Sequence, residues 1–261
     1  MPTRRDIIFK LMSATAASAA VLTAGCAAVA LVTDINVLMR EGEELYRAKR
    51  YDEAITKFKI VVAREPTNLM GWLWLCRTYI VRAMWGDAID SGRRAFALSP
   101  QGADVLPTFL QALFGGGLEA LKNGNFADSI QHFTEYLKLD PGNGSARLNA
   151  SKAYLGNKQY GDALQSLLRA LGVAGGEHRG ETISTLLSGG SQAFREGSYG
   201  NAANLLREYV KHDNRNLQAY LTLAKSYWES GQKSGAVEAF TQALRINPTN
   251  GEALQYMLKL R

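Results

Sequence analysis

The sequence has few of the residues that build metal centres, disulfide frameworks or nucleophilic sites. It contains only 2 cysteines and 3 histidines in 261 residues. Cys26 and Cys76 stand in very different contexts, and His132, His178 and His212 lie far apart without the spacing of a zinc or haem site. It also lacks a glycine-rich phosphate loop and a G-x-S-x-G motif. We therefore expect no enzyme activity, no metal, no cofactor and no small-molecule substrate.

Proline and aromatic side chains are also sparse. The chain has 6 prolines and 9% aromatic residues, whereas alanine and leucine abound, and this balance favours helices. Charged residues make up 21% and are well mixed, which is typical of a folded chain. The net charge of +6 is not gathered into a lysine- and arginine-rich stripe with interleaved aromatics. Nucleic acid is therefore not an expected partner.

The N-terminal segment lacks charge over a long run. It starts with the basic stretch MPTRRDIIFK, and residues 11–33 carry no charged side chain. This is the layout of a secretory signal or a membrane anchor. Alanine, serine and threonine dominate residues 13–20. This composition favours a processed signal, because a stable membrane-spanning helix needs about 20 strongly apolar residues.

The sequence Leu22-Thr23-Ala24-Gly25-Cys26 resembles a bacterial lipobox, in which a cysteine after small residues receives lipid and becomes the mature N-terminus. Thr23 stands where leucine is usual. The resemblance makes Cys26 the predicted lipidation site, residues 1–26 an export leader and residues 27–34 a short tether. The alternative is an uncleaved signal anchor, in which Cys26 is only a small apolar residue.

The expected location follows from this leader. Residues 3–8, Thr-Arg-Arg-Asp-Ile-Ile, resemble a twin-arginine export signal, and the Sec route is the alternative because any basic start serves it. Ala27 follows Cys26. In lipoproteins of the enterobacterial type, the absence of aspartate there implies the outer membrane. We expect a bacterial envelope protein with its folded part in the periplasm, at the outer membrane rather than the inner.

An internal repeat of 34 residues dominates the rest of the chain. Ala54 and Pro66 are twelve residues apart, and Ala88 and Pro100 repeat this pair 34 residues later. Residues 69–102 carry the fullest pattern, with Trp72, Leu75, Cys76, Tyr79, Ala88, Ala95 and Pro100 at repeat positions 4, 7, 8, 11, 20, 27 and 32. This pattern closely resembles the tetratricopeptide-repeat (TPR) family.

The resemblance implies an all-α fold, a right-handed α-solenoid of about six TPR helix pairs with a C-terminal capping helix. Small residues at positions 8 and 20 let the two helices of a repeat approach closely, and proline at position 32 ends the second helix. The repeats are placed at 35–68, 69–102, 110–143, 144–177, 183–216 and 217–250, with inserts at 103–109 and 178–182 and the cap at 251–261. Cys76 fills a small-residue position and is expected to be buried and inert.

The six repeats group into three two-repeat blocks. The odd repeats share a glycine at position 8 and a final asparagine, and the even repeats share a tyrosine at position 11. These residues are Gly42, Gly117 and Gly190; Asn68, Asn143 and Asn216; and Tyr79, Tyr154 and Tyr227. Seven residues make about two helical turns. The insert 103–109 is therefore predicted to lengthen the first helix of the third repeat, with Pro107 in its first turn.

In the TPR architecture the first helices line a concave groove, and the resemblance implies that positions 2, 5, 9, 12 and 13 face it. Positions 5 and 12 are apolar throughout, and each repeat adds one cation at position 9 or 13. This pattern predicts a protein or peptide partner, acidic and either amphipathic or extended. The alternative is that the apolar residues pack between helices and the cations are solvated helix ends. The candidate groove residues are Leu73, Arg77, Ile80, Phe114, Lys122, Leu148, Lys152, Phe194, Arg195, Leu221, Lys225 and Trp228.

The expected function is a membrane-tethered interaction scaffold or assembly factor. TPR lipoproteins that assist outer-membrane machines, such as pilotins, are similar in length and layout. The alternative is a signal-anchored TPR scaffold of a secretion or envelope complex at the inner membrane. The fold hosts many roles, so the resemblance predicts binding and does not name the partner.

Overall fold

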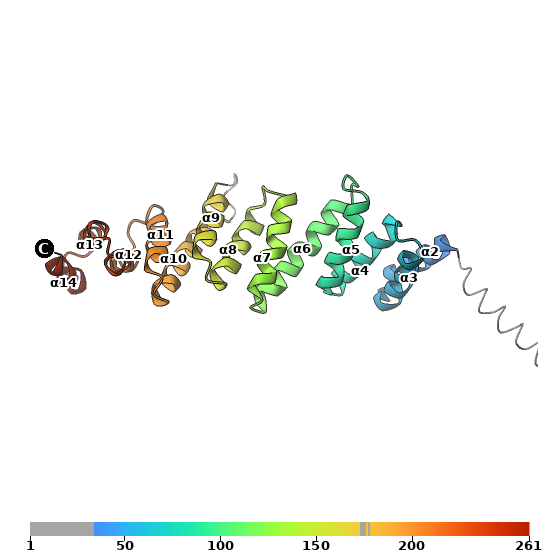
Figure 1. Ribbon diagram of the computed structural model, residues 1–261, viewed down its shortest axis with the longest axis horizontal. Helices are drawn as coiled ribbons and strands as arrows, with labels where there is room; N and C mark the ends of the chain where they lie inside the picture. Colours follow the sequence, from blue (N-terminus) through green and yellow to red (C-terminus); the bar gives the residue numbers. More distant parts are fainter. Residues whose placement is uncertain (1–33, 173–175, 177, 261) are drawn as a thin grey trace, which may run out of the picture. The chain divides into compact units, whose positions relative to one another are not determined.

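The computed structural model describes residues 34–172, 176 and 178–260 (Figure 1). The predicted export leader with Cys26 and nearly all of the tether lie outside the described residues. Within the described ranges the chain forms thirteen α-helices and no strand. The predicted all-α fold class, built from TPR-like helix pairs, is confirmed.

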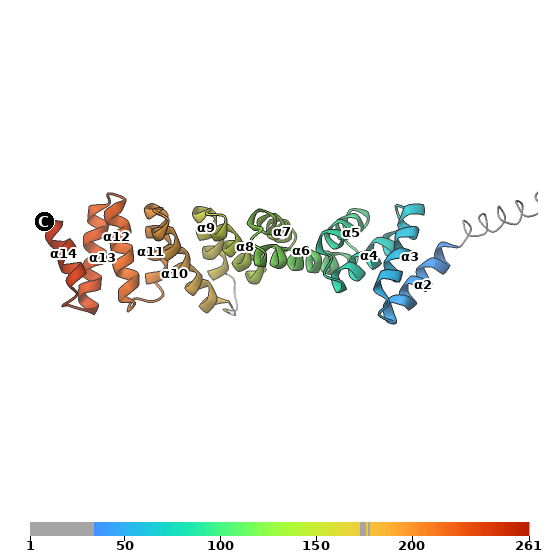
Figure 2. The ribbon, with the colours of Figure 1, turned by 90° about the horizontal axis from the view of Figure 1, so that it is seen from below.

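The chain, whose helices are labelled α2 to α14 in Figures 1 and 2, divides into two compact units at Phe109. The first unit contains α2 (Ile35–Arg47), α3 (Tyr51–Arg64), α4 (Leu69–Val81), α5 (Trp85–Leu98) and the start of α6 (Val105–Lys122). The second contains the rest of α6, α7 (Phe126–Leu139), α8 (Gly144–Gly156), α9 (Tyr160–Leu171), α10 (Arg179–Arg195), α11 (Tyr199–Val210), α12 (Leu217–Glu229), α13 (Lys233–Ile246) and α14 (Gly251–Lys259). Consecutive helices pair as α2 with α3, α4 with α5, α8 with α9, α10 with α11 and α12 with α13.

The two helices of each pair are joined through one residue in the left-handed backbone region. This residue always occupies repeat position 15. Glycine takes this conformation freely, whereas other L-residues pay about 1–2 kcal/mol for it. The six residues, with their φ angles, are Lys49 (60°), Ala83 (53°), Gly124 (77°), Lys158 (60°), Gly197 (75°) and Gly231 (76°).

The glycines shared by the odd repeats lie where a side chain of the second helix packs directly against the first. A Cβ atom on Gly42 would lie 2.5 Å from Cε1 of Phe58, and one on Gly117 would lie 2.8 Å from Cζ of Phe133. Both phenylalanines are fully buried at repeat position 24. The missing side chain therefore makes room for a large ring from the second helix.

The asparagines that close the odd repeats are helix N-caps. The Oδ1 atoms of Asn68, Asn143 and Asn216 accept hydrogen bonds of 2.8, 2.9 and 3.0 Å from backbone N–H groups three residues later, in α4, α8 and α12. Asn250 does the same for α14, at 2.9 Å. Each cap satisfies an N–H group that the first helical turn leaves without a partner. The shared asparagine thus starts the helix of the next repeat.

The predicted lengthening of the third repeat's first helix is confirmed. Helix α6 has 18 residues, compared with 13 in α4, and Pro107 lies in its first turn. Helix α10, after the second insert, has 17 residues. Both inserts therefore extend a first helix at its N-terminal end.

Candidate functional site

The three leucines at position 5 of the even repeats do not line an open trough. Leu73, Leu148 and Leu221 are only 3%, 2% and 4% exposed. Leu148 belongs to the same core cluster as Leu167, and Leu221 to the same cluster as Leu206. The expectation that these leucines contact a ligand is corrected, because their apolar surface is already used in packing between helices.

The cations at position 9 of the even repeats each meet an acid from the insert or cap that follows the repeat. Each acid lies at or just before the first turn of the next first helix, α6, α10 or α14. The nitrogen–oxygen pairs are Arg77 with Asp104 at 3.1 Å, Lys152 with Glu181 at 2.6 Å, and Lys225 with Glu252 at 2.9 Å. The hydrogen bond from Lys152 lowers the pKa of Glu181 below its usual value. The predicted ladder of cations is therefore largely neutralised within the protein.

The aromatic candidates on the first helices are half-buried and contact other side chains. The Nζ atom of Lys225 lies 5.6 Å from the ring centroid of Phe194, a distance that suits a cation–π contact. The rings of Trp228 and Tyr256 meet edge to face at 5.6 Å. Phe114 meets aromatic rings of α7 in the same way. These side chains contribute to packing between helices.

Ile80, Lys122 and Arg195 complete the predicted groove. Ile80 is half-buried, whereas Lys122 and Arg195 are exposed at the ends of α6 and α10. The surface of the first helices is thus a mixture of packed rings, internal ion pairs and single exposed cations. Binding of a partner there stays a prediction.

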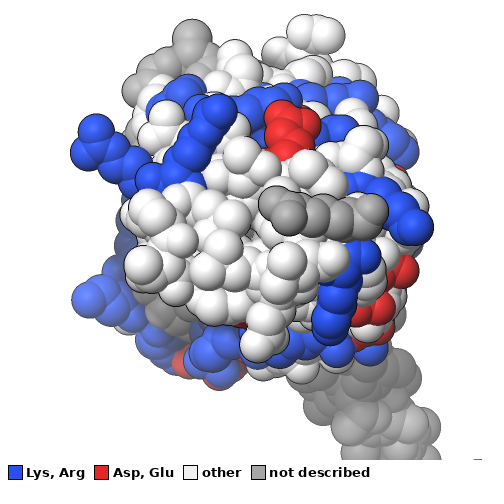
Figure 3. All heavy atoms as spheres, turned by 90° about the vertical axis from the view of Figure 1, so that its left-hand side faces the viewer, with Lys and Arg blue, Asp and Glu red and all other residues white. Residues whose placement is uncertain are grey.

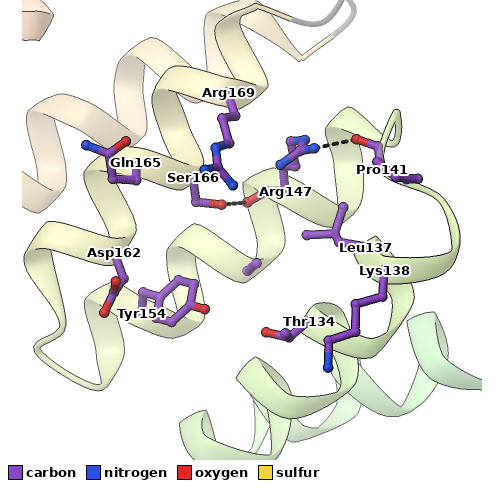
Figure 4. A pocket seen from close by; sticks show the side chains of 11 residues that line it. Thr134, Leu137, Lys138, Pro141, Arg147, Tyr154, Asp162, Gln165, Ser166 and Arg169 are labelled. Atoms are coloured by element: carbon purple, nitrogen blue, oxygen red, sulfur yellow. Dashed lines mark hydrogen bonds between the residues drawn. The ribbon is translucent and has the colours of Figure 1, made fainter.

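A groove that sequence reasoning missed lies between the second helices α7 and α9, with the first helix α8 beneath them (Figure 4). It encloses about 480 Å³. We call it the α7–α9 groove. Its lining is Thr134, Leu137, Lys138 and Pro141 from α7 and the following turn, Arg147, Ala150 and Tyr154 from α8, and Asp162, Gln165, Ser166 and Arg169 from α9.

Backbone carbonyl groups hold part of this lining in place. The Ser166 hydroxyl donates a 2.8 Å hydrogen bond to the Arg147 carbonyl, and the Arg147 guanidinium donates to the Pro141 carbonyl. Figure 4 shows Arg169 extending from α9 on the same side of the groove as Arg147. Among the described residues, none of the cations Lys138, Arg147 and Arg169 forms an ion pair with an acid.

A groove of the same construction occurs one block later, between α11 and α13. It encloses about 410 Å³ and lies over α12. Tyr227 occupies the place of Tyr154, and both belong to the tyrosines shared by the even repeats. The second and third blocks therefore share a groove of this construction.

Cys76 is fully buried, and burial raises the pKa of its thiol to about 12. Its Sγ atom lies 4.0 Å from the Thr108 carbonyl oxygen. A protonated, enclosed thiol is a poor nucleophile, so the prediction that Cys76 is buried is confirmed and its environment fits an inert role. Over the described ranges, no three His, Cys, Asp or Glu side chains gather as a metal site, and none of the helices has the length and hydropathy to cross a membrane.

The C-terminal helix α14 presents an apolar face. Leu254 and Leu258 are 44% and 67% exposed and lie four residues apart, on one side of the helix. Figure 3 views the protein from this end and shows an uncharged area with lysine and arginine side chains around it. Ala253 on the other side of α14 is fully buried, as expected for a capping helix.

Comparison with known proteins identifies the repeat. Two profiles described as tetratricopeptide repeat match residues 114–178 and 193–260, about half of the chain. The cytochrome c-type biogenesis protein CycH of Pseudomonas aeruginosa is 28% identical over 147 residues, which are 56% of this chain and 34% of CycH. The chain thus spans about a third of the length of this curated relative.

A solved structure supports the fold, and a second is reported as similar. A chain of the Naa15/Naa10 complex bound to HypK-THB matches 87% of this chain and 34% of its own length, with 16% identity and a TM-score of 0.51. PilW, described as a widely conserved type IV pilus biogenesis factor, matches 85% of this chain and 98% of its own length, with 19% identity and a TM-score of 0.35. From the matched profiles and the helix pairs with their shared caps and close contacts, the chain belongs to the tetratricopeptide-repeat family.

Proposed function

We propose that the protein is a membrane-tethered scaffold that binds another protein and acts as an assembly factor on the periplasmic side of a bacterial envelope. One observation carries the proposal: the described chain consists of TPR helix pairs, and an uncharged run with a lipobox-like end precedes them. TPR scaffolds typically bind proteins and are typically not enzymes. Such a chain can hold a partner at a membrane without any chemistry of its own.

The match to CycH supports an assembly role. CycH is named as a cytochrome c-type biogenesis protein, and the similarity extends over 147 residues. The proposed role is of that kind, in which the scaffold positions another protein during biogenesis of an envelope component. The alternative, a signal-anchored scaffold at the inner membrane, keeps the same binding function with a different tether.

Lipid labelling tests the tether, and the chain offers a matched control because it has 2 cysteines. Radiolabelled palmitate should enter the wild type and Cys76→Ala, and should not enter Cys26→Ser. Cys76→Ala keeps a small apolar residue in the buried site, so the fold is preserved. An intact mass that shows an unmodified Cys26 with residues 1–25 still attached would establish the signal anchor instead.

Cross-linking in native cells tests the scaffold function. Formaldehyde cross-linking followed by affinity purification of the full-length chain should recover a specific envelope protein. An unrelated lipoprotein, purified in the same way, is the control. If the same proteins accompany both baits at the same abundance, the chain is not a binding scaffold for any of them.

A further inference from the structure

The α7–α9 groove differs from the equivalent places in the other two blocks by its charge. Three positions of the even repeats, 4, 22 and 26, decide the difference. They hold Trp72, Asp90 and Arg94 in the first block, Arg147, Gln165 and Arg169 in the second, and Tyr220, Glu238 and Gln242 in the third. The three side chains together are neutral in the first block, carry two positive charges in the second and carry one negative charge in the third.

In the first block the cation at position 26 is already in contact with an aromatic ring. The Arg94 guanidinium carbon lies 4.9 Å from the ring centroid of Trp72, which suits a cation–π contact. In the second block Arg147 replaces that ring. Arg169, at the position of Arg94, therefore has no tryptophan to cover and faces the groove beside a second arginine (Figure 4).

The cations of the α7–α9 groove differ from those of the first-helix surface. Arg77, Lys152 and Lys225 are each neutralised by an acid of the insert or cap that follows the repeat. The groove is lined by three cations that have no such partner among the described residues, and by one acid, Asp162. The side chains that line this groove of about 480 Å³ therefore carry a net charge of +2. This local excess of positive charge favours a negatively charged ligand.

The remaining lining defines the rest of the ligand. Tyr154 is half-buried and, with Leu137 and Ala150, gives the groove an apolar part beside its cationic part. A guanidinium binds a carboxylate through two parallel hydrogen bonds, and a tyrosine ring packs against an apolar side chain. The volume lies within the range of ordinary ligand pockets and suits a few side chains.

We propose that the α7–α9 groove binds an extended acidic segment of a partner protein, whose carboxylates pair with Arg147 and Arg169 while an apolar side chain packs against Tyr154. The proposal rests on the scaffold function and names the class of partner. It places the binding surface between the second helices α7 and α9, over α8, away from the cations that pair internally.

The test uses the full-length protein in detergent and a short fluorescein-labelled peptide in which glutamates alternate around one tyrosine. The matched peptide carries glutamine in place of each glutamate. Fluorescence anisotropy should show binding of the acidic peptide, at least about tenfold weaker binding of the glutamine peptide, and weakening of the acidic peptide by salt. Arg169→Glu should lower the affinity by at least about tenfold, because it reverses a charge at the ligand.

Two further variants make the test specific. Arg94→Glu changes the same repeat position in the first block and should leave affinity unchanged. Asp162→Asn removes the acid of the groove and should raise affinity several-fold. Circular dichroism of each variant checks the fold. Arg94, Asp162 and Arg169 are all exposed, so the substitutions should leave the packing intact.

Other outcomes overturn the proposal. Equal binding of the acidic peptide by the wild type and Arg169→Glu refutes the proposal. If Lys122→Glu, on the first-helix surface, loses binding of the peptide while Arg169→Glu retains it, the proposal is also refuted. Binding to phosphatidylglycerol vesicles that depends on Arg169, with no binding of the acidic peptide, would assign the groove to a membrane surface. If palmitate labelling and partner recovery succeed while the acidic peptide fails to bind, the groove proposal fails alone and the scaffold function stands.

Discussion

Replacing Gly42 with alanine adds one methyl group where the Phe58 ring of α3 packs against α2. The new Cβ atom would lie 2.5, 2.8 and 3.0 Å from three ring carbons of Phe58, whose side chain is fully buried. The ring is enclosed and cannot swing away, so the helices must separate. Gly86→Ala is the matched control, because a Cβ atom there meets no other group within 4 Å.

The two substitutions should have opposite signs. Alanine in a helix is favoured over glycine by about 0.5–1 kcal/mol, and this gain applies to both sites, less so in the first turn where Gly86 lies. Overpacking a buried contact costs about 1–3 kcal/mol. Gly42→Ala should therefore lower the free energy of unfolding by about 1 kcal/mol, whereas Gly86→Ala should raise it by about 0.5 kcal/mol.

Urea unfolding followed by circular dichroism measures both effects, with the slope of the transition as a check on cooperativity. Repeat proteins couple mainly to their neighbours, so amide exchange should rise first in α2 and α3. The double variant Gly42→Ala/Phe58→Leu should recover part of the loss, because the smaller side chain admits the methyl group. A Gly42→Ala protein that is as stable as Gly86→Ala would show that the two helices are not in contact at this glycine.

Three further predictions address the turns, the caps and pH. Ala83→Gly should raise the thermal midpoint, because the left-handed strain that it removes, about 1–2 kcal/mol, exceeds the cost of the greater entropy of the unfolded chain, about 0.4–1 kcal/mol; a lowered midpoint would contradict this. Asn143→Ala should lower the free energy of unfolding in urea by about 1 kcal/mol, whereas Asn143→Ser should retain most of the cap. Burial, followed by a hydrogen bond to Glu196, raises the pKa of Tyr160 from 10.0 to about 12. The stability that this proton contributes is present below pH 10 and is lost as pH rises towards 12. Because Tyr160 ionises late, the absorbance titration of Tyr160→Phe should lack only a late ionisation. Loss of a step near pH 10 would refute the assignment.

Much of the fold could be predicted because the repeated residues recur at set positions along regular helices. Gly42 leaves room for a side chain of the paired helix and Asn68 caps the helix that follows it, and both roles depend on a spacing that the helix itself determines. The insert 103–109 could be interpreted for the same reason, since seven residues preserve the helical face. The tyrosine shared by the even repeats was visible in the sequence, although the groove that it lines was not.

The candidate site could be predicted less well, because it depends on where long side chains end. The apolar period places Leu73 on the first helix but does not say whether a neighbouring helix covers it. The partner of Lys152 lies 29 residues later, on a helix whose start depends on an insert. The α7–α9 groove is formed by residues from three helices, so no local sequence pattern predicts it. Comparing positions 4, 22 and 26 between the blocks would have revealed its excess of positive charge.

The ion pairs between Arg77 and Asp104, and between Lys152 and Glu181, lie at the boundaries between blocks. These ion pairs bear on how the number of repeats can change by gene duplication. Copying the second block together with the insert before it, residues 103–177, reproduces a matched junction, because a copy of Asp104 then follows Lys152 by 27 residues, the spacing of Arg77 and Asp104. Copying one even repeat places the cation opposite the second position of another even repeat, which holds Met70, Ser145 or Gln218 and no acid. We expect such arrays to gain and lose repeats in twos.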